Sequence, residues 1–289
     1  MPRIIPTLRE AALVLTGRKT AGRNLTVFDD DIFLVSYPRS GNTWARFLVG
    51  NLLYDEPVTF ANVDSRIPEI YLFPDRILRR APRPRVLKSH ECFDPRYKRV
   101  IYIVRDPRDV AVSYYHYAIK RRLIPETYGI AAFIPRLMAS EFDVQWSWAA
   151  NWQDHVMSWY RMRDGMPGFL FLRYEDMLED TIGELARVAL FFGFEPSRER
   201  LRRAVELGSA DRMRDLEKTQ GRSWRLTQST RLDQPFVRAA TANTWQNVLS
   251  PPALAAIESA WGQAMQEFGY TLSSDPGILD GAAPGESRP

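Results

Sequence analysis

The chain has 289 residues, of which 45% are hydrophobic and 26% are charged, a composition typical of a globular protein with a substantial core. Its 39 basic and 35 acidic residues leave a formal net charge of only +4, which is too small to indicate a nucleic-acid partner. The single cysteine, Cys92, excludes an intramolecular disulfide and fits a reducing cytoplasm. No apolar run is long enough for stable insertion into a membrane, so we expect a cytoplasmic protein.

Short apolar runs alternate with longer stretches of helical periodicity along the chain. Strands are expected at residues 32–36, 86–88, 99–104 and 169–172, and helices at residues 42–54, 107–119, 181–192 and 251–268. This alternation predicts an α/β fold in which helices flank a parallel central sheet. We expect one domain over residues 1–272 and a flexible tail over residues 273–289, which are rich in Gly, Pro and Ser. The five arginines among the prolines of residues 76–85 are interpreted as a solvated surface loop.

A loop of eight residues, 37–44, joins the first predicted strand to the first predicted helix. Backbone N–H groups at such a helix start converge on an anion, and Gly41 lets the backbone approach it closely. The Walker A pattern is absent, so the spacing leaves open both a phosphate-binding loop and a simple capped helix. In the first case the loop's side chains offer donors and a flat surface for a purine: Arg39, Ser40, Asn42, Thr43 and Trp44.

A second candidate anion segment follows the third predicted strand. Arg105 stands at the carboxyl end of that strand, where open α/β sheets bind ligands, and Ser113 lies about two turns into the next helix. Together they could bind a second phosphate. The spacing leaves open the alternative that Arg105 pairs with Asp106 or Asp109 and that Ser113 merely faces the core.

The candidate base is His90, one of three histidines, which lies just beyond the second predicted strand. A histidine there can accept a proton near neutral pH, and Lys88, two residues away, shares its face if the strand persists. His116 and His155 are expected to be packed structural residues. No Cys/His/carboxylate cluster has metal-ligand spacing, so we predict no metal, and no G-x-S-x-G elbow favours a hydrolase.

These segments resemble the motifs of the cytosolic-type sulfotransferases. The octet Tyr-Pro-Arg-Ser-Gly-Asn-Thr-Trp at 37–44 matches six of the eight positions of the family's 5′-phosphosulfate loop, Tyr-Pro-Lys-Ser-Gly-Thr-Thr-Trp. Residues 100–117 resemble its 3′-phosphate motif, and Lys88-Ser89-His90 resembles its Lys-Thr-His.

The resemblance implies a P-loop-containing, sulfotransferase-like fold and a co-substrate, 3′-phosphoadenosine 5′-phosphosulfate (PAPS), that becomes adenosine 3′,5′-bisphosphate. It implies in-line transfer of the sulfuryl group to a hydroxyl or amine of a small-molecule acceptor, with His90 as general base and Lys88 and Arg39 stabilising the developing charge. The residues that it assigns to the nucleotide are Arg39, Ser40, Gly41, Asn42, Thr43, Trp44, Arg105, Ser113, Tyr174 and Arg238.

The sequence departs from the family in its C-terminal phosphate motif, Arg-Lys-Gly followed by Gly-Asp-Trp-Lys-Asn. Residues 236–247 keep Arg238, Trp245 and Asn247 but lose both glycines and the lysine, which puts close backbone approach in question. Trp224 is a candidate for the second aromatic side chain that the family packs against the adenine. The family's dimerisation motif is also missing, so the oligomeric state stays open.

Two other functions remain open at this point, a small-molecule kinase of the P-loop type and a nucleotide-binding protein without transfer activity. The acceptor is not determined by the sequence. Segments 118–148 and 211–235 are expected to wall its pocket. An apolar pocket would use Phe133, Leu137, Phe142, Trp146 and Trp148, whereas an acidic or sugar-like acceptor would use Arg121, Arg122 and Arg136.

Overall fold

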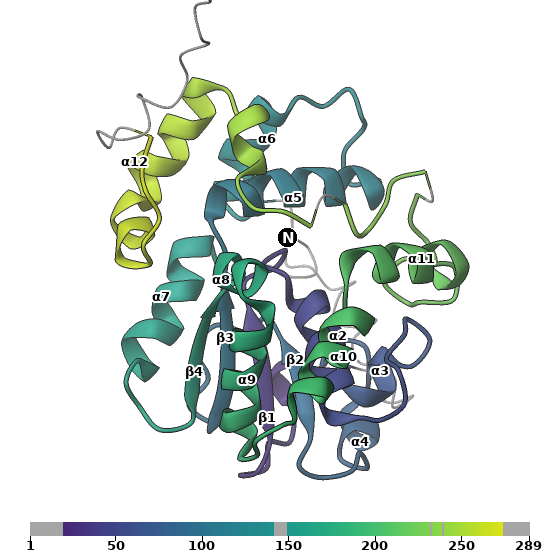
Figure 1. Cartoon of the computed structure of the whole chain (residues 1–289). Coiled ribbons are helices and arrows are strands. Elements are labelled where there is room, and N and C mark those ends of the chain that lie inside the picture. Colours follow the sequence, from purple (N-terminus) through teal and green to yellow (C-terminus); the bar gives the residue numbers. More distant parts are fainter. Residues whose placement is uncertain (1–19, 142–148, 232, 239, 274–289) are drawn as a thin grey trace, which may run out of the picture.

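The computed structural model describes residues 20–141, 149–231, 233–238 and 240–273. Its centre is a sheet of four parallel strands in the order β2-β1-β3-β4. The strands are β1 (Ile32–Ser36), β2 (Val86–Ser89), β3 (Arg99–Val104) and β4 (Phe169–Arg173). The parallel α/β prediction is confirmed, and each predicted strand lies within one residue of its observed bounds (Figure 1).

Helices cover both faces of this sheet and its carboxyl end. They are η1 (Gly22–Asn24), α2 (Asn42–Leu53), α3 (Val63–Arg66), α4 (Asp75–Leu78), α5 (Pro107–Lys120), α6 (Ile130–Met138), α7 (Trp152–Arg163), α8 (Tyr174–Glu179), α9 (Thr181–Phe192), α10 (Arg198–Leu207), α11 (Ala210–Gln220), η2 (Thr244–Asn247) and α12 (Pro251–Glu267). Within the described residues none of these helices has both the length and the apolar character that a membrane span requires.

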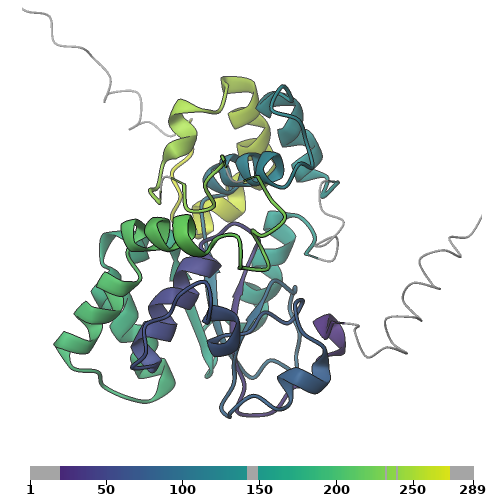
Figure 2. The same ribbon diagram turned by 90° about the vertical axis from the view of Figure 1, so that its right-hand side faces the viewer.

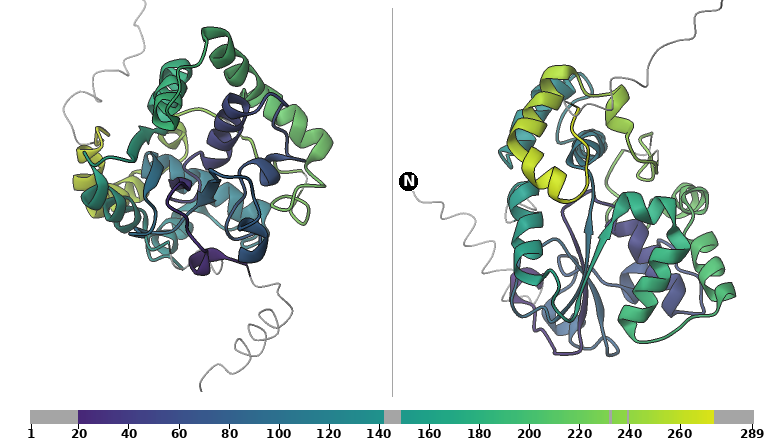
Figure 3. Two further views of the ribbon diagram at one scale, coloured as in Figure 1. Left: turned by 90° about the horizontal axis from the view of Figure 1, so that it is seen from below. Right: turned by 60° about the vertical axis from the view of Figure 1, so that its left-hand side comes forward.

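The side chains of β1 alternate between two hydrophobic clusters. Phe33 and Val35 belong to the cluster that includes α7 and α12, whereas Ile32 and Leu34 belong to the cluster formed by α2, α9 and α10. Figure 3 shows the sheet between α7 on one side and α2, α9 and α10 on the other. All four side chains are fully buried, which contributes about 1.5–3 kcal/mol each before entropy costs. This two-sided burial explains why β1 reads as a continuous apolar run.

The helices that flank the carboxyl end of the sheet begin and end at local signals. Pro107 begins α5, and the Asp106 side chain caps it by accepting a hydrogen bond from the N–H of Arg108. Gly193 ends α9 with a φ of 93°, a left-handed conformation that glycine adopts without strain. Beyond the carboxyl ends of the strands, α5, α6 and α12 pack together (Figures 1 and 2).

The arginine-rich segment 76–85 is only partly a solvated loop. Four of its five arginines are exposed, as predicted, but Arg85 is 2% exposed. Its Nε donates to Asp31 Oδ1 at 2.8 Å and its Nη2 to Asp31 Oδ2. The interpretation is therefore wrong for Arg85, because a fully buried carboxylate before β1 requires a charged partner.

The predicted tail falls almost entirely outside the described residues, which end at Ser273. Ser273 itself is bound to α12, since its Oγ donates to Glu258 Oε2 at 2.6 Å. The single-domain boundary at residue 272 stays a prediction.

Candidate functional site

All four strands deliver a predicted site residue at the same edge of the sheet. The loop 37–41 follows β1, His90 follows β2, Arg105 follows β3 and Tyr174 follows β4. These segments line one cavity of about 330 Å³, at the place where parallel sheets bind ligands. Of the residues assigned to the site from sequence, all except Ser40 line this cavity.

The loop after β1 is shaped by two residues in the left-handed region, Arg39 with a φ of 71° and Gly41 with a φ of 89°. A Cβ at Gly41 would lie 2.4 Å from Tyr174 Cδ2, so only glycine lets the loop pass this ring. Ser40 is fully buried, and its hydroxyl has no hydrogen-bond partner among the described residues. Asn42 anchors the loop, because its Nδ2 donates to Leu34 O at 3.2 Å.

Two aromatic side chains form one wall of the cavity. The Trp44 and Tyr174 rings meet edge to face, with centroids 5.5 Å apart, and Trp44 Nε1 donates to Gly208 O at 3.0 Å. These contacts fix the orientation of both rings before any ligand binds.

The side chain of Arg39 lies toward the second phosphate segment. Its Nε donates to Ser113 Oγ at 3.2 Å, and its guanidinium lies 4.5 Å from the Tyr117 ring centroid and 5.0 Å from that of Phe236. Burial lowers the pKa of Arg39 to about 10, which leaves it charged at neutral pH. The structure thus joins the two segments that the sequence treated separately.

Arg105 is the second cation of the site. Its guanidinium stacks 4.3 Å from the Tyr174 ring centroid and donates to the carbonyls of Arg39 and Thr241 at 3.3 and 3.2 Å. Its Nε has no partner among the described residues. Burial, and then the charge of Arg105, lowers the pKa of Arg238. Three arginines facing one cavity, with an orphaned donor beside them, fit a polyanionic ligand.

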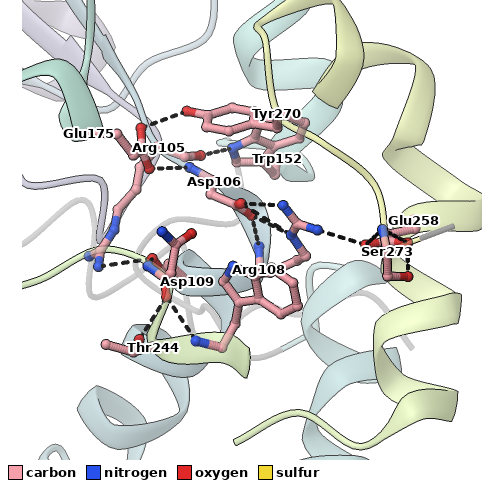
Figure 4. Close-up of polar contacts among 12 residues, drawn as sticks. Arg105, Asp106, Arg108, Asp109, Trp152, Glu175, Thr244, Glu258, Tyr270 and Ser273 are labelled. Atoms are coloured by element: carbon pink, nitrogen blue, oxygen red, sulfur yellow. Dashed lines mark hydrogen bonds and ion pairs between the residues drawn. The ribbon is translucent and has the colours of Figure 1, made fainter. Parts of the chain in front are cut away.

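Asp109 supports the cavity wall, although the sequence placed it only as a possible partner of Arg105. That pair exists, at 3.8 Å between Arg105 Nη2 and Asp109 Oδ2. The fully buried carboxylate also accepts hydrogen bonds from Asn243 N at 2.8 Å, Thr244 Oγ1 at 2.6 Å and Trp245 N at 3.1 Å. Asp109 therefore attaches the C-terminal segment to α5 beside Arg105 (Figure 4).

A second buried network supports the start of α5. Asp106 pairs with Arg108 rather than with Arg105, with Arg108 Nε donating to Asp106 Oδ1 at 3.0 Å, and Arg108 Nη1 contacts Glu258 Oε1 of α12 at 2.7 Å. The N–H of Asp106 donates to Glu175 Oε1 at 3.0 Å. Figure 4 shows these contacts reaching from α12 to the end of β3. They fix the backbone that carries Arg105.

His90 is 4% exposed, and its tautomer follows from its contacts. Nδ1 lies 2.7 Å from Ser36 O, and a carbonyl only accepts, so Nδ1 carries the proton and Nε2 is the basic nitrogen of the neutral ring. Burial, followed by the charge of Lys88, holds the pKa of His90 well below its usual value. The ring is therefore neutral at pH 7, as a general base must be.

The backbone carbonyl of His90 is held by the side chain of His155, which Tyr102 holds in turn. His155 Nε2 donates to His90 O at 3.0 Å, and the Tyr102 hydroxyl donates to His155 Nδ1 at 2.7 Å. Burial lowers the pKa of His155 to about 4. This agrees with the predicted structural role of His155, and the pKa of His116, half-buried on α5, is likewise lowered to about 4 by burial and then by Arg238.

The apolar wall of the cavity comes partly from unexpected segments. It is formed by Leu48, Leu178, Val205, Met213, Leu226 and Phe236. Phe133 and Leu137 are buried in the core instead, and Phe142, Trp146 and Trp148 lie outside the described residues. Trp224 lies in a third core cluster, where its Nε1 donates to Asp64 Oδ2 at 3.2 Å. Its N–H is thus engaged away from the cavity.

The three predicted acceptor arginines, Arg121, Arg122 and Arg136, do not line the cavity. Arg121 Nη1 donates to the Tyr117 hydroxyl at 3.2 Å, and Arg136 pairs with exposed Glu141. Among the described residues, no group of three or more His, Cys, Asp or Glu side chains is placed to hold a metal ion.

Known proteins are similar to this chain over most of its length. The family model described as "Sulfotransferase domain" matches residues 29–269. The chain is 28% identical to mouse (Mus musculus) Sulfotransferase 2B1 over 273 residues, covering 88% of this chain and 78% of the relative. It is 26% identical to rat (Rattus norvegicus) Sulfotransferase 1A1, covering 86% and 89%.

Solved structures show the same similarity. Mouse sulfotransferase SULT7A1, complexed with PAP, matches with a TM-score of 0.68 and 25% identity, covering 85% of this chain and 87% of the other. Retinol dehydratase in complex with androsterone and inactive cofactor PAP matches with a TM-score of 0.72 at 21% identity, covering 88% and 86%, and supports the fold alone.

Proposed function

We propose that this chain, which belongs to the sulfotransferase family and is a PAPS-dependent enzyme, transfers the sulfuryl group to a hydroxyl or amine of a small-molecule acceptor. The observation that carries the proposal is the position of His90. Its Nδ1 lies 2.7 Å from Ser36 O, which makes Nε2 the basic nitrogen of a neutral ring that lines the cavity.

PAPS supplies the activated sulfuryl group when bound. The 5′-phosphosulfate end fits the loop after β1, where Gly41 and the start of α2 offer backbone N–H groups. The 3′-phosphate fits Arg105, Ser113 and Arg238, because all three side chains line the same cavity. Trp44 and Tyr174 flank the remaining space and suit the adenine.

His90 takes the proton from the acceptor at Nε2, which makes the acceptor atom a better nucleophile. Lys88 and the N–H groups of the loop stabilise the negative charge that develops on the departing phosphate oxygen. Arg39 contributes positive charge to the same cavity while contacting Ser113. No covalent intermediate with the protein is needed, since the acceptor displaces the phosphate directly.

The apolar wall defined above favours an acceptor with a hydrophobic body. Dehydrating such a molecule against Leu178, Met213 and Leu226 contributes binding energy in proportion to the apolar area that is buried. The solved structure that holds androsterone is a protein of similar fold with an apolar small molecule bound. A cytoplasmic location is part of the proposal and is based on the single Cys92.

Purified protein incubated with sulfur-labelled PAPS and a panel of phenols, sterols and amines tests the activity directly. We expect label on at least one acceptor without added divalent metal, an outcome that also disfavours a P-loop kinase. The His90→Gln variant should lose transfer while calorimetry still detects adenosine 3′,5′-bisphosphate, and His116→Gln serves as the matched histidine control. Full turnover by His90→Gln would exclude His90 as the base. Nucleotide binding by wild type with no transfer to any acceptor would instead support the non-catalytic alternative.

A further inference from the structure

A buried ion pair lies directly behind the catalytic edge of β2. Lys88 Nζ is 2.7 Å from Glu69 Oε2, and the two side chains are 5% and 0% exposed. Lys88 lines the cavity together with His90, whereas Glu69 does not. The carboxylate therefore contacts the site only through Lys88.

The backbone holds Glu69 in register with Lys88. The two residues form an isolated parallel bridge, in which Lys88 N donates to Pro68 O at 2.9 Å and Ile70 N donates to Lys88 O at 3.2 Å. The segment 68–70 thus extends the sheet beside the end of β2. Because both partners are fixed by the same ladder, the position of Glu69 determines where the Lys88 ammonium lies.

The second oxygen of this carboxylate is unpaired in the described part of the chain. Glu69 Oε1 is buried and lacks a hydrogen-bond partner there. A buried carboxylate is costly unless its charge is compensated. Here Lys88 compensates the charge of Glu69. Burying this ion pair still costs desolvation energy, so packing alone does not explain it. An effect of the carboxylate on the Lys88 ammonium does.

The groups around Lys88 shift its pKa in opposite directions. Burial lowers the pKa of Lys88, the charge of Glu69 opposes this shift, and nearby Arg46 adds to it. Arg46 is fully buried on α2 and is neutralised by Asp64 at 2.6 Å. His90 faces Lys88 from the end of the same strand. Without Glu69, the desolvated ammonium would lose the carboxylate that contacts it directly, and its pKa would fall further.

We infer that Glu69 is a positioning residue for sulfuryl transfer, which orients the Lys88 ammonium at the cavity wall and keeps it charged. The inference rests on the proposed role of Lys88 in stabilising the departing phosphate oxygen. It assigns to Glu69 no contact with the nucleotide or with the acceptor, so its loss should affect kcat far more than the KM for PAPS.

The test is the pH profile of kcat for the full chain. For Glu69→Gln we expect kcat at pH 7.5 to fall about tenfold or more, with a KM for PAPS within about threefold of wild type. We also expect the alkaline limb of the profile to move to lower pH, because the variant's ammonium deprotonates earlier. Glu69→Asp keeps the negative charge, so the alkaline limb of its pH profile should stay in place. The shorter aspartate side chain should still lower kcat.

The matched control is Asp31→Asn, which neutralises an equally buried carboxylate at the amino end of β1. It costs stability without approaching the cavity, so its pH limb should coincide with that of wild type. A Glu69→Gln enzyme with the wild-type profile would overturn the inference. If that variant does not fold by circular dichroism, Glu69→Asp decides, and wild-type kcat in it would refute the positioning role.

Failure of the wider proposal has a different signature. If wild type transfers no sulfuryl group, the proposed function fails. If wild type is active and Lys88→Met keeps full kcat, the role of Lys88 fails and the inference falls with it. Full activity in wild type, loss in Lys88→Met and an unchanged Glu69→Gln profile would reject the role of Glu69 alone.

Discussion

Replacing Gly41 with alanine places an atom where the structure has no room for one. The new Cβ would lie 2.4 Å from Cδ2 and 2.7 Å from Cε2 of Tyr174, whereas carbon atoms in contact are about 3.5–4.0 Å apart. The Tyr174 ring must therefore move by about 1 Å. Because the Arg105 guanidinium stacks on that ring at 4.3 Å, the movement reaches the arginine that we propose for the 3′-phosphate.

The size of the effect follows from two separate terms. A φ of 89° costs a residue with a side chain about 1–2 kcal/mol of stability. Losing the stacking of Arg105 on Tyr174 costs about 0.5–2 kcal/mol, which corresponds to a dissociation constant for the nucleotide that is roughly 2- to 30-fold weaker. The first term concerns folding and the second concerns binding, so they can be measured independently.

Gly193→Ala is the matched control, because Gly193 has a φ of 93° and a Cβ added there would meet no atom within 4 Å. Both variants should lose stability in urea unfolding, and Gly41→Ala should lose more, because its Cβ also displaces the Tyr174 ring. Only Gly41→Ala should bind adenosine 3′,5′-bisphosphate more weakly in a calorimetric titration. Equal dissociation constants for the two variants would refute the argument that the loop depends on the close approach of Tyr174.

Three further predictions concern other buried ionisable side chains. Asp109→Ala removes the acceptor of three hydrogen bonds and should raise the KM for PAPS about tenfold in initial-rate assays. An unchanged KM would contradict the role of Asp109 in holding the C-terminal segment beside the nucleotide site that we propose. Arg85→Met leaves Asp31 buried and unpaired and should lower the free energy of unfolding in urea by about 3–5 kcal/mol. Arg83→Met is the control and should lower it little, because the ion pair of Arg83 is exposed. Similar losses in the two variants would contradict the burial argument. Folding lowers the pKa of His155 from 6.5 to about 4. The contribution of the neutral ring to the free energy of unfolding is therefore complete above pH 6.5 and is lost as the pH falls toward 4. The loss amounts to up to about 3 kcal/mol. His155→Gln should remove that part of the acid destabilisation, and an unchanged pH dependence would refute it.

The elements that the sequence predicted correctly are those determined by local patterns. Each buried strand is a short apolar run, and α2, α5, α9 and α12 carry proline, glycine or cap residues at their ends. Because every parallel strand brings its carboxyl end to the same edge, strand ends alone were sufficient to gather His90, Arg105 and Tyr174. The candidate site therefore follows from strand order and motif order along the chain.

What the sequence could not predict depends on contacts between distant segments. The hydrogen bond from Asn243 to Asp109 spans 134 positions, and no periodicity records such a partner. Glu69 lies in an irregular segment whose pairing with β2 is visible only after folding. The direction of Arg39 depends on packing against Tyr117 and Phe236, since a long side chain has several rotamers at one backbone position.

The C-terminal motif shows how the chain retains a turn after losing its glycines. In order along the motif, the family's two glycines correspond to Ala240 and Asn243, and these residues adopt φ values of 54° and 60°. The left-handed region costs energy for alanine and less for asparagine. Asp109 offsets this cost, because two of its three hydrogen bonds come from backbone N–H groups of the turn. Ala240 and Thr244 consequently line the cavity beside Arg238. A carboxylate on α5 therefore holds this turn beside Arg105 without the family's glycines.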